Sequence, residues 1–317
     1  MARGLLVMSY GSPPDEDGIE QYYTHIRRGR PPSTEQLEDL RRRYAAIGGT
    51  SALTRRTAEQ VAAITAALDA DGDWIVELGT KHSDPSIEDA VGRLLGSGVD
   101  RIVGLVLAPH YSAASVGQYH GRATEALGEA AGVRYERIDS WHLLPELLAF
   151  QEATLRSTLA GLSGPSGSGA PDGLRTKVVF TAHSLPERSL VDDPYPDLLF
   201  ESAGEIARRA GLAPWAGWGI GWQSAGATPE PWRGPDLLEI IDDLAATRRS
   251  DALVVVPQGF TSEHLEVLYA IDSEARAAAE AVGLELARTR VVNDDPEVMS
   301  GLARLCAETL EGPGGRR

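Results

Sequence analysis

The stretch Val178-Val179-Phe180-Thr181-Ala182-His183-Ser184-Leu185-Pro186 joins an apolar run to a polar loop that contains a proline. The apolar part has the length and the β-branched composition of a buried strand. A second run of this kind, residues 252–256, leads through a short loop to Glu266 at the start of an expected helix. Ligands of open α/β sheets bind beside the carboxyl ends of the strands. His183 and Glu266 are therefore a candidate pair for accepting protons near neutral pH or for holding a divalent metal.

Strand-like and helix-like runs alternate along the rest of the chain. Alternation of this kind is typical of parallel sheets with crossover helices, so the predicted fold class is α/β. Helical periodicity predicts helices that include residues 56–68, 112–131 and 236–247. Short apolar runs predict strands at residues 4–10, 74–80, 102–108, 177–182, 217–222 and 252–256.

The chain is expected to divide into two α/β halves. Residues 162–173 are rich in Gly, Ser and Pro and are predicted to form an exposed, flexible connection. The predicted halves are residues 1–143 and 144–295. A last helix, at about residues 296–312, is expected to pack back on the first half.

The composition excludes some classes of protein. The 317 residues carry a formal charge of −16, which disfavours non-specific binding to nucleic-acid phosphates. Cys306 is the only cysteine, so neither an intrachain disulfide nor a cysteine-held [2Fe–2S] cluster is expected, which fits a cytoplasmic protein. No apolar run is long enough to predict a transmembrane helix.

Taken singly, the two candidate residues have simpler explanations. His183 could cap a loop through a hydrogen bond, although the surrounding rigid, turn-rich sequence suits a functional side chain. Glu266 could belong to an ordinary solvated helix face. In a regular helix Glu266 and Glu274 share one face, whereas His264 and Asp272 point elsewhere.

Other candidate residues also follow predicted strands or lie in stiff loops. Tyr10 ends the first strand and could hydrogen-bond a ligand, approach a metal or simply rim the core. Trp232 lies in a proline-rich loop that follows Ser224 and could line a flat apolar ligand. Lys81-His82 follows another strand and is interpreted as structural or as lying behind the site.

Basic residues gather in the first part of this acidic chain. Their guanidinium groups could bind the carboxylates of a polyanionic ligand, although each arginine by itself is more simply read as a solvated side chain. The adjacent sequence Gly48-Gly49-Thr50-Ser51 could offer N–H groups and a hydroxyl to an anion. The arginines are Arg27, Arg28, Arg30, Arg41, Arg42, Arg43, Arg55 and Arg56.

These motifs together resemble those of the ferrochelatase family, most closely the coproporphyrin ferrochelatases of Gram-positive bacteria. The resemblance covers nearly the whole chain, with several long motifs in the same order. The matching stretches are GLLVMSYG (4–11), YYTHIRRGR (22–30), RYAAIGG (43–49), TAHSLPE (181–187), DPYPD (193–197), GWQS (221–224), PWRGP (231–235) and GFTSEHLEVLY (259–269).

The resemblance implies two Rossmann-like, chelatase-type domains with parallel sheets and a porphyrin cleft between them. It implies insertion of Fe²⁺ into a porphyrin with release of two protons. The expected partners are porphyrin and Fe²⁺, and a monomer with no permanently bound cofactor is expected. His183 and Glu266 are expected on one face of the macrocycle. Tyr10 is expected on the other face, where it would ligate the product iron.

The resemblance also assigns residues around the macrocycle. It places Arg27, Arg28, Arg43 and Ser51 in segments that hold the propionates, and Ser224 and Trp232 in loops that line the cleft. The chain departs from some relatives at Ala270, where they carry an acidic residue, so an acidic metal relay along that helix is not carried over.

The substrate and the proton path are less determined by the sequence. Coproporphyrin III has four propionates and protoporphyrin IX two, so the many arginines, Tyr10 and the resemblance favour coproporphyrin III. His183 is expected to be neutral at pH 7 and to accept a pyrrole proton. Glu266 could orient His183, accept the second proton or carry the iron, and the metal could instead arrive from the Tyr10 side.

Three alternative functions remain at this point. A protoporphyrin IX ferrochelatase would use the same chemistry. A cobalt or nickel chelatase for a sirohydrochlorin-like ring is typically shorter and richer in histidine. A haem-binding or haem-delivery protein on the same scaffold would need an axial ligand but no pair of proton acceptors.

Overall fold

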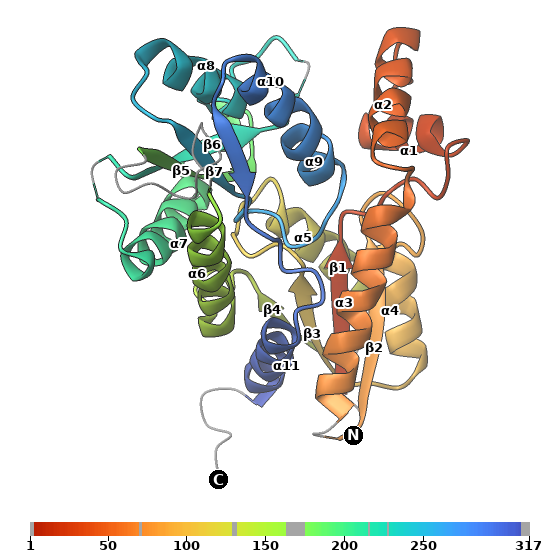
Figure 1. The fold of residues 1–317 in the computed structure, drawn as a ribbon. Helices are drawn as coiled ribbons and strands as arrows, with labels where there is room; N and C mark the ends of the chain where they lie inside the picture. Colours follow the sequence, from red (N-terminus) through yellow and green to blue (C-terminus); the bar gives the residue numbers. More distant parts are fainter. Residues whose placement is uncertain are drawn as a thin grey trace. The chain divides into compact units, whose positions relative to one another are not determined.

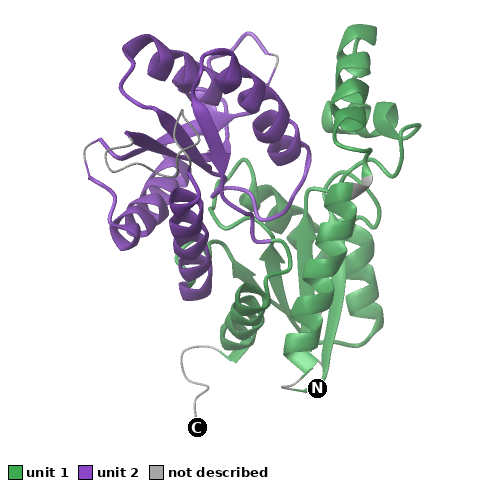
Figure 2. Ribbon diagram, in the orientation of Figure 1, with its two compact units in different colours: residues 1–144, 293–317 green, residues 145–292 purple. Residues whose placement is uncertain are grey.

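The computed structural model describes residues 3–69, 72–128, 132–162, 175–214, 216–226 and 228–311. The chain forms two compact units (Figure 2), which are Met1–Leu144 with Asn293–Arg317 (unit 1) and Pro145–Val292 (unit 2). These bounds lie within a few residues of the predicted halves, 1–143 with 296–312 and 144–295. The assignment of the two halves as separate chelatase-type domains stays a prediction.

Unit 1 is built on a four-stranded parallel sheet with the strand order β2-β1-β3-β4 (Figure 1). Leu5, Leu6, Val7 and Met8 of β1 are all fully buried, as expected for a parallel sheet covered on both faces. The strands are β1 (Arg3–Ser9), β2 (Trp74–Thr80), β3 (Arg101–Val106) and β4 (Arg134–Ile138). The helices are α1 (Ile19–Ile26), α2 (Thr34–Ala46), α3 (Ser51–Asp69), α4 (Ile87–Gly96), α5 (Val116–Leu127) and α11 (Pro296–Glu311).

The C-terminal helix α11 belongs to unit 1, where it packs against α3, β3 and β4. Its residues Val298, Leu302 and Cys306 recur at helical spacing and are buried. The chain therefore returns to its first unit after completing the second.

Unit 2 repeats the plan with a second parallel sheet of order β6-β5-β7-β8. Its core lies around Phe180, Val254 and Ile241, which are all fully buried. The strands are β5 (Thr176–His183), β6 (Trp218–Gln223), β7 (Ala252–Val256) and β8 (Glu285–Arg288). The helices are α6 (Pro145–Ala160), α7 (Tyr195–Ala210), α8 (Leu237–Thr247), α9 (Leu265–Leu268) and α10 (Arg276–Ala281), with a 3₁₀ turn at Glu187–Ser189 and a π-helix at Ala270–Ala275.

Local sequence explains where several helices begin and end. Ser33 opens α2 with a capping box in which its hydroxyl accepts from the Gln36 N–H and the Gln36 side chain accepts in return. Asp236 and Glu239 form the same arrangement at the start of α8. Gly211 ends α7 in the left-handed conformation, with φ of 75°, which costs a glycine little.

The α/β fold class with parallel sheets is confirmed, but two strands were missed by the sequence analysis. β4 has the sequence Arg-Tyr-Glu-Arg-Ile and β8 the sequence Glu-Leu-Ala-Arg, and each is an edge strand. Charged residues are common on edge strands, where one side meets solvent, so they conceal the strand pattern. The predicted connection 162–173 lies outside the described residues except for Leu162, which is buried rather than exposed.

The expectation of one regular helix after Glu266 is wrong. Helix α9 ends at Leu268, and a π-helix follows at Ala270–Ala275 before α10 begins. The wider π turn breaks the 3.6-residue period, so Glu266 and Glu274 cannot be assigned one face by counting. Asp272 lies inside this π segment and accepts two hydrogen bonds from Arg288, at 2.8 and 2.7 Å.

No helix in the described part of the chain is long and apolar enough to cross a membrane.

Candidate active site

The strand order places a switch point in each sheet. In the spatial order 2-1-3-4, the strands that are first and third in sequence lie side by side. The chain leaves them in opposite directions, and ligands bind at such switch points. In unit 2 these strands are β5 and β7. His183 is the last residue of β5, and the loop after β7 leads to Glu266 in α9. Topology therefore brings the two residues to one place.

The predicted contact is present between side chains. The His183 Nδ1 and a Glu266 carboxylate oxygen are 2.9 Å apart, although the residues are 83 positions apart in sequence. The Tyr195 hydroxyl donates to the His183 carbonyl at 3.3 Å. The Gln223 amide donates to the Glu266 carbonyl at 3.1 Å. These two hydrogen bonds hold the backbone at His183 and at Glu266, from which the two side chains reach each other.

The two side chains shift each other's pKa in opposite directions. Burial alone would lower the pKa of His183, but the charge and hydrogen bond of Glu266 outweigh it and raise that pKa above its ordinary value. Burial would raise the pKa of Glu266, yet His183, with smaller contributions from His264 and Ser224, holds that pKa well below its usual range. The pair therefore favours an imidazolium beside a carboxylate.

This direction bears on the expectation that His183 is neutral at pH 7, which stays a prediction. That expectation rested on the ordinary histidine pKa near 6.5. A raised pKa means that a larger fraction of His183 is protonated at any given pH. The imidazole must lose this proton before it can act as a base.

Ser224 also contacts the pair, because a side-chain hydrogen bond between Ser224 and Glu266 helps to lower the pKa of Glu266. Ser224 has φ of 61°, which is unusual for a residue other than glycine and marks a constrained turn directly after β6. The indole Nε1 of Trp232 donates to the Thr228 hydroxyl at 2.9 Å. Its ring packs so tightly on Gly226 that a Cβ there would lie 2.5 Å from it. The loop therefore holds Trp232 in one orientation.

The remaining predicted residues belong to unit 1. Tyr10 directly follows β1, and its side chain is 42% exposed. In the sheet of unit 1, β1 has the position that β5 has in the sheet of unit 2. Arg27 and Arg28 follow α1, and Arg28 has φ of 57°. Arg43 in α2 forms an ion pair of 2.7 Å with Asp39. The grouping of these residues, and of Ser51 at the start of α3, with the pair in unit 2 stays a prediction.

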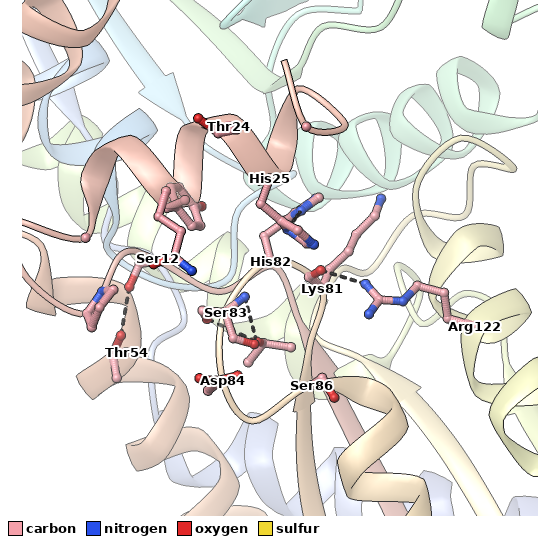
Figure 3. Close-up of a pocket in the computed structure, with 16 residues that line it drawn as sticks. Ser12, Thr24, His25, Thr54, Lys81, His82, Ser83, Asp84, Ser86 and Arg122 are labelled. Atoms are coloured by element: carbon pink, nitrogen blue, oxygen red, sulfur yellow. Dashed lines mark hydrogen bonds between the residues drawn. The ribbon is translucent and has the colours of Figure 1, made fainter. Parts of the chain in front are cut away.

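Unit 1 also contains a cavity of about 580 Å³ that the sequence analysis did not identify. It lies among α1, the loop after β2 and α5 (Figure 3). His25 and His82 line it, and their Nδ1 atoms are 3.1 Å apart. His82 was interpreted as structural and His25 was not considered. The only signal in the sequence was the position of Lys81-His82 just beyond a strand.

Basic side chains contribute to the lining of this cavity. Burial, followed by the charges of Lys81, His25 and Arg122, lowers the pKa of His82 to about 3. Burial, followed by the charges of Arg122 and Arg28, lowers the pKa of Lys81 to about 8. Arg122 is held by Glu88 through two hydrogen bonds of 2.8 and 2.6 Å. His82 is therefore a neutral imidazole at physiological pH.

Metal-binding groups are sparse elsewhere. Within the described ranges, no cluster of three or more His, Cys, Asp or Glu residues is arranged to hold a metal ion. Cys306 is buried in α11, and burial raises the pKa of its thiol.

Comparison with known proteins agrees with this architecture. A family model described as Ferrochelatase matches residues 2–310. A coproporphyrin III ferrochelatase of Anoxybacillus flavithermus is 40% identical over 98% of this chain and 97% of its own. That of Bacillus subtilis is 40% identical over 97% of both chains. One of Bacillus anthracis is 43% identical over 92% of both chains.

Solved structures support the fold at lower identity. SirB from Bacillus subtilis with Fe³⁺ aligns with a TM-score of 0.59 at 12% identity, over 100% of this chain and 98% of that one. DR2241 from Deinococcus radiodurans, described as similar to chelatases, aligns with a TM-score of 0.52 at 15% identity, over 100% of this chain and 56% of its own. At these identities the likeness concerns the chelatase fold alone.

Proposed function

Because this chain belongs to the ferrochelatase family, we propose that it inserts Fe²⁺ into coproporphyrin III to form coproheme, with the release of two protons, in haem biosynthesis. The observation that carries the proposal is the 2.9 Å contact between His183 and Glu266, two residues that share one switch point. The relatives named for this reaction support it, since they match the chain over nearly its full length.

The porphyrin must first be anchored and bent. The pyrrole N–H groups of a flat ring block its centre, and binding energy at the propionates can be used to expose the nitrogen lone pairs. We assign this anchoring to Arg27, Arg28, Arg43 and Ser51. Arg43 is paired with Asp39, so a propionate would compete with that carboxylate for the guanidinium.

In this proposal the neutral form of His183, which has first released its imidazolium proton to solvent, accepts a pyrrole proton. Its Nδ1 is engaged by Glu266, so Nε2 is the atom that faces the pyrrole N–H. The Glu266 carboxylate orients the imidazole and stabilises the imidazolium that forms, as its effect on the pKa of His183 implies. Glu266 also remains a candidate acceptor for the second proton and a candidate ligand for the incoming iron.

The other assigned residues complete the site. Trp232 and Ser224 line the macrocycle, with Ser224 also contacting Glu266. Tyr10 is assigned to the opposite face of the ring, where its phenol ligates the product iron. A monomeric state, a cytoplasmic location and the absence of a resident cofactor or [2Fe–2S] cluster remain predictions.

The direct test is anaerobic mixing of the purified chain with Fe²⁺ and metal-free coproporphyrin III, followed by absorbance. Catalytic turnover that requires His183 is the expected result. Tight binding of coproheme without turnover would instead favour a carrier on the same scaffold. Preserved porphyrin binding with no metallation by any divalent ion would overturn the proposal.

A further inference from the structure

We propose that His25 and His82 form a second divalent-metal site, on the Tyr10 side, from which Fe²⁺ passes to the porphyrin. The inference rests on the proposed function for the identity of its metal, and it adds the face from which that metal enters. The geometry that supports this inference comes from unit 1 alone.

The spacing of the two imidazoles is that of a chelating pair. Their Nδ1 atoms are 3.1 Å apart, and the ring centroids are 5.1 Å apart at an interplanar angle of 72°. Two nitrogen ligands about 2.1 Å from one metal, at octahedral or tetrahedral angles, are themselves about 3.0–3.4 Å apart. The nitrogen atoms therefore already have the spacing that a shared metal requires, although the rings must turn so that both Nδ1 lone pairs point to it.

The protonation of the pair suits this exchange. In the metal-free pair one imidazole donates its Nδ1–H to the Nδ1 of the other. Metal binding requires both Nδ1 lone pairs, so the donor must carry its proton on Nε2 instead. This is a change of tautomer that releases no net proton. Neutral imidazole is also a suitable ligand for Fe²⁺.

The pair is open to incoming ions on one side and adjacent to Tyr10 on the other. His25 is exposed and lines the cavity of about 580 Å³ together with Thr24 and Asp84 (Figure 3). His82 packs against Tyr10, with ring centroids 4.6 Å apart and ring planes inclined by 59°. Its backbone N–H donates to the Tyr10 carbonyl at 3.0 Å. A metal bound by His25 and His82 would thus be next to a ring, that of His82, which itself contacts the Tyr10 phenol assigned to the iron.

The nearby charges favour passage of the metal over storage. Lys81 and Arg122 lie beside His82 and repel a cation, although Glu88 partly neutralises Arg122. Among the described residues only two are placed to act as ligands here, so water would fill the other coordination positions. Both features weaken binding, and a metal that must be handed on cannot be held tightly.

The first test measures metal binding without porphyrin. Co²⁺ is titrated into His183→Ala, which removes the other candidate site, and into the double variant His183→Ala/His25→Ala, with the ligand-field spectrum as the readout. The double variant is expected to bind Co²⁺ at least tenfold more weakly. Thr24→Ala in the same background is the matched control, because it alters the same helix and cavity without removing an imidazole.

The second test uses steady-state kinetics of the otherwise unaltered enzyme. In His25→Ala and His25→Asn, the KM for Fe²⁺ is expected to rise about tenfold, while kcat and the KM for porphyrin stay within twofold. Asn can replace the hydrogen bond to His82 but is a poor ligand for the metal. If His25→Asn behaved like the wild type, the pair would serve only as a hydrogen bond and the inference would be overturned.

The two proposals fail separately. Unchanged Co²⁺ affinity in the His25 variants would remove the second site while leaving iron insertion intact. Absence of turnover by the wild type would remove the proposed function and, with it, the assignment of Fe²⁺ as cargo, even if the Co²⁺ titrations still revealed a metal site.

Discussion

At the scale of single residues, the pairing of His183 with Glu266 carries the chemistry. Each residue alone is ambiguous, since a lone histidine can cap a loop and a lone glutamate can be solvated. Together they lie 2.9 Å apart and shift each other's pKa in opposite directions. Pairs of titratable groups whose pKa values are shifted in opposite directions are frequent at sites of proton transfer.

Replacing His183 by alanine is expected to remove the base while sparing the substrate anchors. Turnover should fall by a factor of roughly 100 to 10,000, the usual contribution of a positioned base. Porphyrin affinity should change little, because the propionates are assigned to residues of unit 1. Stopped-flow metallation and fluorescence quenching by bound porphyrin measure the two quantities separately.

Trp141→Phe is a suitable reference for that variant, because Trp141 is buried in unit 1 and its indole donates to the Val106 carbonyl at 2.9 Å. It should lower stability without a selective loss of turnover by the folded fraction. Normal metallation by His183→Ala would rule out His183 as the base.

The influence of Glu266 on His183 can be measured by titration. The folded pKa of His183 is raised, so its proton is lost only at a pH above the ordinary value near 6.5. The pair therefore stabilises the fold below that value and loses this contribution as the pH rises through the raised pKa. Glu266→Gln removes the charge and should lower the pKa of His183, because burial then dominates.

NMR of the His183 Cε1–H across the pH range checks this shift. The expected order is a higher pKa in the wild type than in Glu266→Gln. An equal or higher value in the variant would show that the carboxylate does not set the protonation of His183.

The sequence was informative about these residues to different degrees. His183 and Glu266 were predictable because they lie at or beyond the carboxyl end of a strand, and these strand ends share an edge of the sheet. The contact between His25 and His82 was not, because it joins residues 57 positions apart and depends on ring orientation. Whether Arg43 is engaged by Asp39 likewise depends on rotamers that a sequence does not specify.

At the scale of secondary structure, buried elements were easier to predict than edges and irregular turns. The central strands β1, β3, β5 and β7 are continuous apolar runs, so they were recognised. The edge strands β4 and β8 are short and rich in charged residues and were missed, whereas the more apolar edge strands β2 and β6 were predicted. The π-helix after α9 was also missed, because its residues have no sequence pattern that separates a π turn from a regular helical turn.

The junction between β5 and the loop after β7 is expected to tolerate no added atom at Gly259. A Cβ there would lie 2.6 Å from the Ala182 Cβ and 2.9 Å from its Cα, next to His183. Gly259→Ala should therefore cost about 1–3 kcal/mol of stability. It should also reduce turnover of the folded protein by displacing His183, as judged by thermal unfolding and metallation rates.

Gly121→Ala is the matched control for this prediction. Gly121 lies in α5, is exposed and has no heavy atom within 4 Å of an added Cβ. Alanine should be neutral or slightly stabilising there, since it lowers the entropy of the unfolded chain. Equal tolerance of both substitutions would contradict the packing argument.

At the scale of the whole molecule, the chain uses one strand order twice. Tyr10 follows β1 and His183 ends β5, so the residues assigned to opposite faces of the porphyrin occupy corresponding positions in the two sheets. The family match over residues 2–310 extends across both units. The proposed chemistry therefore depends on residues from both units rather than on either sheet alone.

The central claim is iron insertion with a preference for coproporphyrin III, and a competition experiment tests it most directly. Equimolar coproporphyrin III and protoporphyrin IX are mixed anaerobically with the enzyme and limiting Fe²⁺, and the two haem products are quantified by chromatography. Their ratio reports the ratio of the kcat/KM values. We predict at least a tenfold excess of coproheme. An excess of protohaem, or no haem product, would contradict the account.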